Sequence, residues 1–130
     1  MEDCLFCKII KGEIPSKTIY EDEIVKVMMD INPISDGHIL VIPKNHNTDL
    51  LDLDDDTLLH IKRITTEILI PKLKEKLNCD GITICQNNGL GQEIKHFHVH
   101  LIPRYENDNI KMTNKENIED IEEIYNKLMD

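Results

Sequence analysis

The sequence lacks the features that mark a membrane-spanning or exported chain. None of its apolar runs approaches the roughly 18 residues needed to cross a bilayer. Its first residues, Met1 to Cys4, have neither the basic region nor the apolar core of a signal peptide. It also has no internal repeat, low-complexity tract or long linker. We therefore expect one cytoplasmic domain over residues 1–130, with no membrane partner and room for a single core.

Basic residues are scarce and scattered. The chain has 15 Lys and Arg against 25 Asp and Glu, for a formal net charge of -10, and no basic cluster. A surface of this sign repels phosphate backbones, so the charge argues against a general nucleic-acid binder. If the ligand is an anion, we expect imidazoles and backbone N–H groups to bind it.

Cysteine is limited to four residues, and only one Cys-x-x-Cys pair is present, at Cys4 and Cys7. Without a second pair, this motif is ambiguous between half of a zinc site, a redox pair and two buried thiols. Cys79 and Cys85 are interpreted as small apolar residues that fill space in the core.

Histidine is the residue type with the clearest pattern. The segment His96-Phe97-His98-Val99-His100-Leu101-Ile102 places an imidazole at every second position. Because side chains alternate between faces along a strand, His96, His98 and His100 are predicted to share one face, opposite an apolar face. Both a metal site and a catalytic site explain this pattern.

The rest of the chain predicts four further strands and two helical regions. The strands are expected at Thr18–Tyr20, Ile24–Ile31, His38–Pro43 and Ile82–Gln86. The acidic run Asp52–Asp56 is typical of a helix start, and Pro71 should bend or divide that helix near Glu67. Thr113–Glu116 fits a capping box for a final amphipathic helix, expected to be an accessory packing element. His38 and His46 lie at opposite ends of one strand, roughly 20 Å apart, and cannot share one site.

Three segments together resemble the histidine triad (HIT) family, closest to its small nucleotide-binding branch. They are the alternating histidines, the preceding Asn87-Asn88-Gly89 and Gly91-Gln92, and the upstream stretch from Asp30 through His38 to Lys44. The resemblance covers about Cys4 to Tyr105. It implies an α+β fold with a five-stranded antiparallel sheet, packed helices and a homodimer that joins two sheets. The C-terminal helical extension, about 113–129, lies outside the shared core.

The resemblance also implies a reaction. Family members hydrolyse or transfer nucleoside monophosphates held in phosphoramidate or related bonds, so a purine nucleotide or nucleoside phosphoramidate is the expected partner. By this resemblance His98 attacks phosphorus and becomes nucleotidylated, while His100, His38 and Gln92 surround the phosphate and leaving group. The implied nucleotide contacts are Asn87, Gly91 and Gln92 for phosphate, Asp30 for ribose, and Phe6, Ile9, Ile14, Met28 and Ile31 for the base.

The same resemblance gives the cysteine pair a role. Relatives with Cys-x-x-Cys commonly bind structural zinc, which here implies the ligands Cys4, Cys7, His46 and His96. Two thiolates balance the dication, and four N and S ligands suit tetrahedral zinc. The chain departs from the family at Glu93, where some relatives have serine, and in the loop before Gln92, which is a residue or two shorter.

Two other hypotheses remain open from the sequence. The first is a non-catalytic nucleotide-binding interaction protein, whose partners recognise its bound state. Alternatively, the three alternating histidines are ligands of one catalytic metal, as in some zinc hydrolases.

Overall fold

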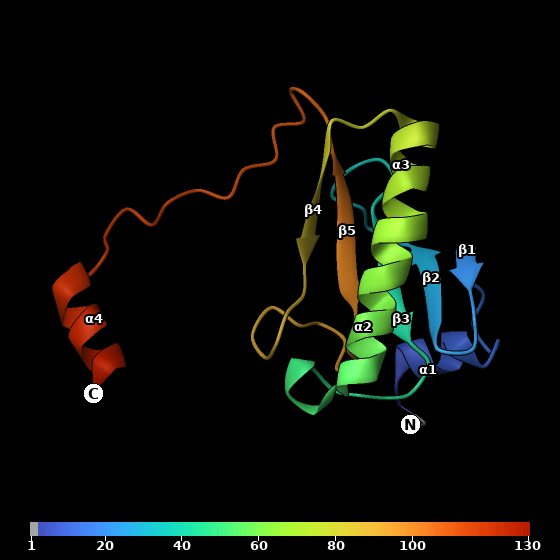
Figure 1. The fold of residues 1–130 in the computed structure, drawn as a ribbon, viewed down its shortest axis with the longest axis horizontal. Coiled ribbons are helices and arrows are strands. Elements are labelled where there is room, and N and C mark those ends of the chain that lie inside the picture. The colour runs from blue at the N-terminus through green and yellow to red at the C-terminus, as the bar shows by residue number, and fades with distance from the viewer. Residues whose placement is uncertain (1–2) are drawn as a thin grey trace.

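A five-stranded antiparallel sheet forms the centre of the computed structural model, which describes residues 3–130 (Figure 1). Its strands are β1 (Thr18–Glu21), β2 (Val25–Met29), β3 (Ile39–Pro43), β4 (Gly81–Cys85) and β5 (Val99–Arg104). They are ordered β1-β2-β3-β5-β4, and each neighbouring pair is antiparallel. The predicted α+β architecture is therefore confirmed, with β3 and β5 at the centre and β4 at one edge.

One long helical rod crosses a face of this sheet. It consists of α2 (Asp55–Ile64), a π-helical segment (Thr65–Leu69) and α3 (Ile70–Leu77). Asp54 caps α2 by accepting the Thr57 N–H, as the acidic run predicted. Because Pro71 lacks an N–H group, the regular ladder is interrupted just before it, and the π segment lies at the predicted position.

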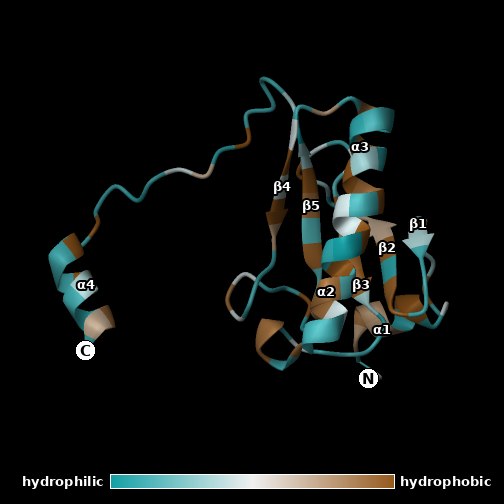
Figure 2. Ribbon diagram, viewed as in Figure 1, coloured by the Kyte–Doolittle hydropathy of each residue, from teal (hydrophilic) through white to brown (hydrophobic). Residues whose placement is uncertain are grey.

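Apolar side chains fill both faces of the sheet. Ile39 and Val41 of β3 face the helical rod, whereas Leu40 and Ile42 face the short helix α1 (Leu5–Ile10) on the other side. A strand buried on both faces reads as a continuous apolar run, which explains the sequence of β3. Figure 2 shows the same pattern, with hydrophobic residues along the central strands and mixed colours on the rod.

The histidine segment differs from its prediction in one respect. The strand begins at Val99, so His96 and His98 precede it. The reason is local, because the Phe97 N–H donates to the Asn47 carbonyl at 2.7 Å instead of joining the β ladder. Side-chain alternation persists nevertheless, since Phe97, Val99 and Leu101 all lie in the core beneath the rod.

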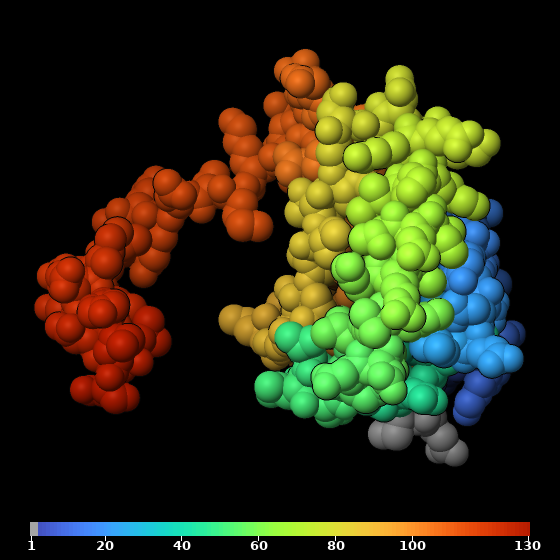
Figure 3. All heavy atoms as spheres, viewed as in Figure 1, coloured from blue at the N-terminus to red at the C-terminus, as the bar shows by residue number. Residues whose placement is uncertain are grey.

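The C-terminal helix α4 (Ile121–Met129) lies apart from the body, which we define as residues 3–110 (Figure 1). The predicted capping box at Thr113 is wrong, because Asp120 caps the helix by accepting the Glu122 N–H. Every residue from 111 to 130 is exposed, and Figure 3 shows this arm standing clear of the body. Within one chain, therefore, α4 is not the packing element that was expected.

Within 3–130, no helix has the length and apolar character required to cross a bilayer.

Candidate functional site

Four of the predicted site residues meet at one end of the central strands. Asp30 follows β2, His38 immediately precedes β3, and His100 lies on β5 opposite Leu40. The His38 Nε2 and His100 Nδ1 atoms are 2.9 Å apart, and the His98 and His100 ring centroids are 4.9 Å apart. The fold therefore gathers three histidines from segments some 60 positions apart.

Backbone contacts fix which ring nitrogens in this group carry hydrogen. The Ile34 N–H donates to His38 Nδ1 at 3.0 Å, so the proton of the neutral His38 ring is on Nε2. His38 Nε2–H then donates to His100 Nδ1, which leaves the proton of His100 on its own Nε2. This chain of donors makes His100 Nε2–H a hydrogen-bond donor on the free side of its ring.

His98 is fixed in the opposite tautomer. Its Nδ1–H donates to the His96 carbonyl at 2.8 Å, so Nε2 keeps an unshared electron pair. The ring is 8% exposed and lies edge-on to Phe6, with centroids 4.9 Å apart. The site thus presents a nucleophilic nitrogen on His98 next to a donor nitrogen on His100.

Burial favours the neutral form of all three rings. Desolvation lowers the pKa of His38, although the nearby Asp30 carboxylate opposes this effect. Desolvation likewise lowers the pKa of His98, against the hydrogen bond to the His96 carbonyl. For His100, burial and then the neighbouring His98 and His38 lower the pKa to about 4.

The residues expected around a base form an apolar cluster beside His98. Phe6, Ile9 and Met28 are buried in it, and Ile14 packs against its margin. Ile31 is different, because it is 89% exposed and stands outside this cluster. Asp30 lies at the edge, with one carboxylate oxygen 3.4 Å from His38 Nε2 and the other accepting the Asn32 N–H.

The glycine-containing loop is arranged differently from the expectation for Gln92. Its side-chain amide donates to the Thr48 carbonyl at 2.6 Å and accepts the Gly89 N–H at 3.3 Å. The side chain is therefore bonded to its own loop and to the segment after β3, and not to the histidines. Asn87 lies next to Gly91 in the same loop, as their sequence separation allows.

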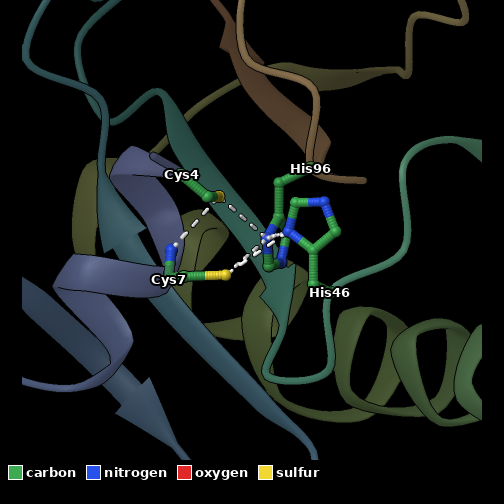
Figure 4. A group of neighbouring side chains, drawn as sticks. All are labelled: Cys4, Cys7, His46 and His96. Atoms are coloured by element: carbon green, nitrogen blue, oxygen red, sulfur yellow. Dashed lines mark hydrogen bonds between the residues drawn. The ribbon is translucent and has the colours of Figure 1, made fainter. Parts of the chain in front are cut away.

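The first histidine of the alternating segment belongs to a second, separate cluster. His96 meets Cys4, Cys7 and His46, and their donor atoms all lie within 4.8 Å of one another (Figure 4). His96 Nδ1 is 3.3 Å from Cys4 Sγ, 3.6 Å from Cys7 Sγ and 3.1 Å from His46 Nδ1. Ligands of a tetrahedral zinc ion are about 3.3 to 3.8 Å apart, given ordinary Zn–N and Zn–S bond lengths. The spacing of these four side chains therefore fits zinc.

The tautomer of His96 also fits a metal ligand. Its Nε2–H donates to the Pro43 carbonyl at 2.7 Å, which leaves the electron pair of Nδ1 directed at the thiols. Cys7 Sγ is also 3.4 Å from His46 Nδ1. Cys4 and Cys7 are buried at the start of α1, so a metal here would join that helix to the segment before β5.

A catalytic metal held by His96, His98 and His100 is not supported by this geometry. His96 turns toward the cysteines, and the three rings form no common ligand group within residues 3–130. Asp30, His38 and His100 do have ligand atoms within 4.8 Å of one another, which is close enough for a metal site. However, coordination through His38 Nε2 would place a proton on Nδ1, facing the Ile34 N–H. Two donors would then oppose each other, so this trio is better suited to proton transfer than to metal binding.

Sequence reasoning missed the backbone groups that fix these rings. They are the Ile34 N–H and the carbonyls of Pro43 and His96. Every residue has such groups, so no side-chain pattern distinguishes them.

Fold and site together define a class of proteins in which a segment of alternating histidines leads into an antiparallel sheet. A further histidine, here His38, lies beside that segment at the start of the neighbouring strand. The HIT domain matches residues 11–107, and this chain belongs to the HIT family. An HIT-like protein of Methanocaldococcus jannaschii is 45% identical over 132 residues, which cover 96% of this chain and 98% of the relative.

Two other relatives have named activities. An adenosine 5'-monophosphoramidase of Candida albicans is 41% identical, over 78% of this chain and 70% of its own. An adenylylsulfatase of Arabidopsis thaliana is 37% identical, over 82% of this chain and 54% of its own.

Solved structures agree with this assignment. A zinc-bound histidine triad protein from Mycobacterium smegmatis is 34% identical with a TM-score of 0.79, covering 89% of this chain and 85% of that chain. A crystal structure from Streptococcus mutans is 34% identical with a TM-score of 0.86, covering 99% of this chain and 83% of that chain.

Proposed function

We propose that the protein is a nucleotidyl hydrolase or transferase that cleaves nucleoside 5'-phosphoramidates or related phosphate bonds. One observation carries the proposal. The His98 ring keeps an unshared electron pair on Nε2, next to a His100 ring whose Nε2 bears hydrogen. The named activities of the fungal and plant relatives support adenosine monophosphate as the transferred group.

In the first step His98 Nε2 forms a bond to the α-phosphorus as the P–N bond to the leaving amine breaks. The electron pair of that bond goes to the amine nitrogen, which binds a proton from solvent, while His100 Nε2–H donates a hydrogen bond to the departing group. The His38 Nε2–H bond to His100 Nδ1 orients the His100 ring during this transfer. The product of this step is a nucleoside monophosphate attached to His98.

Water completes the reaction in the second step. Its oxygen bonds to phosphorus, the P–Nε2 bond breaks, and the electron pair returns to His98. The proton released by water returns to solvent, which balances the proton taken up in the first step, and His98 is neutral again. The apolar cluster of Phe6, Ile9, Ile14 and Met28 would bind the base, with Asp30 beside the ribose.

Substrate binding would have to rearrange the glycine-containing loop. We propose that Gln92 leaves the Thr48 carbonyl and that Asn87 and the loop N–H groups contact the phosphate. Ile31, exposed in the free protein, would then cover the base.

Zinc would be held by Cys4, Cys7, His46 and His96. A closed shell of four protein ligands leaves no position for an activated water, so this metal would act by bracing the site. We further propose a homodimer in which two sheets join, since strand β4 is an edge of the sheet.

The proposal is tested by incubating the protein with adenosine 5'-phosphoramidate and measuring release of the monophosphate. We expect turnover to fall at least about 1,000-fold in His98→Ala, because the covalent route is lost. His60→Ala is the matched control, since His60 pairs with Asp22 outside the site and its loss should leave turnover unchanged. Nucleotide binding by calorimetry without turnover of any phosphoramidate would support a non-catalytic binding protein instead.

A further inference from the structure

The arm, which we define as residues 111–130, has an apolar face without a partner in the body, residues 3–110. Ile121, Ile124, Tyr125 and Leu128 lie at the spacing of one helix face, and they are 70%, 39%, 54% and 78% exposed. No hydrogen bond joins α4 to the body in the part of the chain that the structure describes, and none of its residues is buried. The face is therefore available for contact with another molecule.

A helix of this length needs such a contact. α4 has nine residues, fewer than the roughly 12 to 15 at which isolated helices become even marginally stable in water. Its opposite face is polar, with Glu122, Glu123 and Lys127. Packing of the apolar face against a protein surface would supply the free energy that the isolated helix lacks.

The position of the arm points to a second copy of this chain. β5 leads into the arm, and Figure 1 shows the arm passing the edge strand β4 and placing α4 on that side, away from the body. The edge strand has no partner on its outer side within residues 3–130, and its Ile84 is 52% exposed. If the body of a second copy joined the sheet at β4, it would lie between α4 and the body of the chain to which α4 belongs.

The Streptococcus mutans relative supports the same position. The first 110 of 130 residues make up about 85% of this chain, and each residue contributes at most its equal share to a TM-score. A TM-score of 0.86 over 99% of the chain therefore requires part of the arm to superpose as well as the body. This relative therefore places the corresponding segment in a similar position relative to its body.

We propose that α4 docks through Ile121, Ile124, Tyr125 and Leu128 onto a second copy of the chain, so that two protomers exchange their arms. This inference rests on the homodimer proposed above but not on the hydrolytic reaction. Failure of the phosphoramidate assay would leave it standing, and free arms on an active dimer would overturn it alone.

The direct test mixes isotope-labelled and unlabelled full-length chains and records isotope-filtered nuclear Overhauser effects. We expect contacts between the Tyr125 ring of one chain and side chains of the other. Contacts of Tyr125 only with the body of its own chain would show that the arm folds back. Contacts of Tyr125 with no residue outside α4 would show that the arm is free. Either result overturns the proposal.

Sedimentation velocity over a range of concentrations provides a second measurement. The variant Ile124→Asp with Leu128→Asp should dissociate about 100-fold more readily, because two apolar side chains no longer become buried. The variant Glu123→Gln with Lys127→Gln changes the polar face of the same helix and should dimerise like the parent. Equal dimerisation of the acidic variant and the parent would contradict the proposal. Apart from loss of the nine-residue α4, the far-UV circular dichroism of the acidic variant should match that of the parent, since the arm does not pack on its own body.

Discussion

Replacement of Gly37 by alanine should destabilise the protein and weaken its reaction together. Gly37 precedes His38 and has a φ of +91°, in a region that L side chains rarely adopt. An added Cβ would overlap Leu77 Cδ1 and lie 3.2 Å from Pro103 Cγ. Leu77 is 40% exposed, so the end of its side chain can turn aside, whereas Pro103 is fully buried and must give by a few tenths of an ångström, which presses on the segment before His38.

The magnitude follows from these two effects. A positive φ costs an alanine roughly 1 to 2 kcal/mol, part of which is offset because alanine restricts the unfolded chain. Overpacking against the buried Pro103 adds roughly 1 kcal/mol, the lower end of the usual range, because Leu77 can turn aside. We therefore expect Gly37→Ala to lower the free energy of unfolding by about 2 kcal/mol.

Gly12 offers a matched control. Its φ is +84°, but nothing lies within 4 Å of an added Cβ, so Gly12→Ala should cost only about 1 kcal/mol. Urea unfolding followed by circular dichroism measures both values. Turnover of the phosphoramidate should fall in the folded Gly37→Ala protein and persist in Gly12→Ala. Equal stability losses in the two variants would refute the packing argument, and full activity of Gly37→Ala would refute the role given to His38.

Three further predictions concern the metal, acid stability and the first hairpin. Cys7→Ser should lower the bound zinc from one ion per chain to none by elemental analysis, whereas Cys85→Ser, outside the ligand group, should retain it. Because burial and the neighbouring histidines lower the pKa of His100 to about 4, the unfolded chain binds a proton between about pH 6.5 and 4 that the folded chain does not. Stability is thus lost as pH falls through this window, and His100→Gln should lose less of it in acid denaturation curves. Asp22 accepts the Val25 N–H and three other hydrogen bonds, so Asp22→Asn should cost about 1 to 3 kcal/mol in urea unfolding.

Local sequence patterns predicted the elements well because each pattern has a direct physical cause. The apolar run Ile39–Ile42 is buried on both faces of the sheet, and a π segment interrupts the regular helix around Glu67, where Pro71 was expected to bend or divide it. Alternation in the histidine segment also correctly separated Phe97 and Val99 from the imidazole face.

Long-range backbone contacts decided what those patterns left open. The Asn47 carbonyl takes the Phe97 N–H and delays the start of β5, and the Thr48 carbonyl takes the Gln92 amide. Neither partner is recognisable in the sequence, because any residue has a carbonyl. The start of α4 was misplaced for another reason, since both Thr113 and Asp120 are good caps and only one begins the helix.

Detection of a covalent intermediate on His98 tests the central claim most directly. The protein is mixed with excess adenosine 5'-phosphoramidate, quenched within milliseconds to seconds, digested and analysed by mass spectrometry. The account predicts one adenosine monophosphate group on the peptide containing His98, formed and lost at rates compatible with turnover. Turnover without any adduct on that peptide, or with the group attached to another residue, would contradict it.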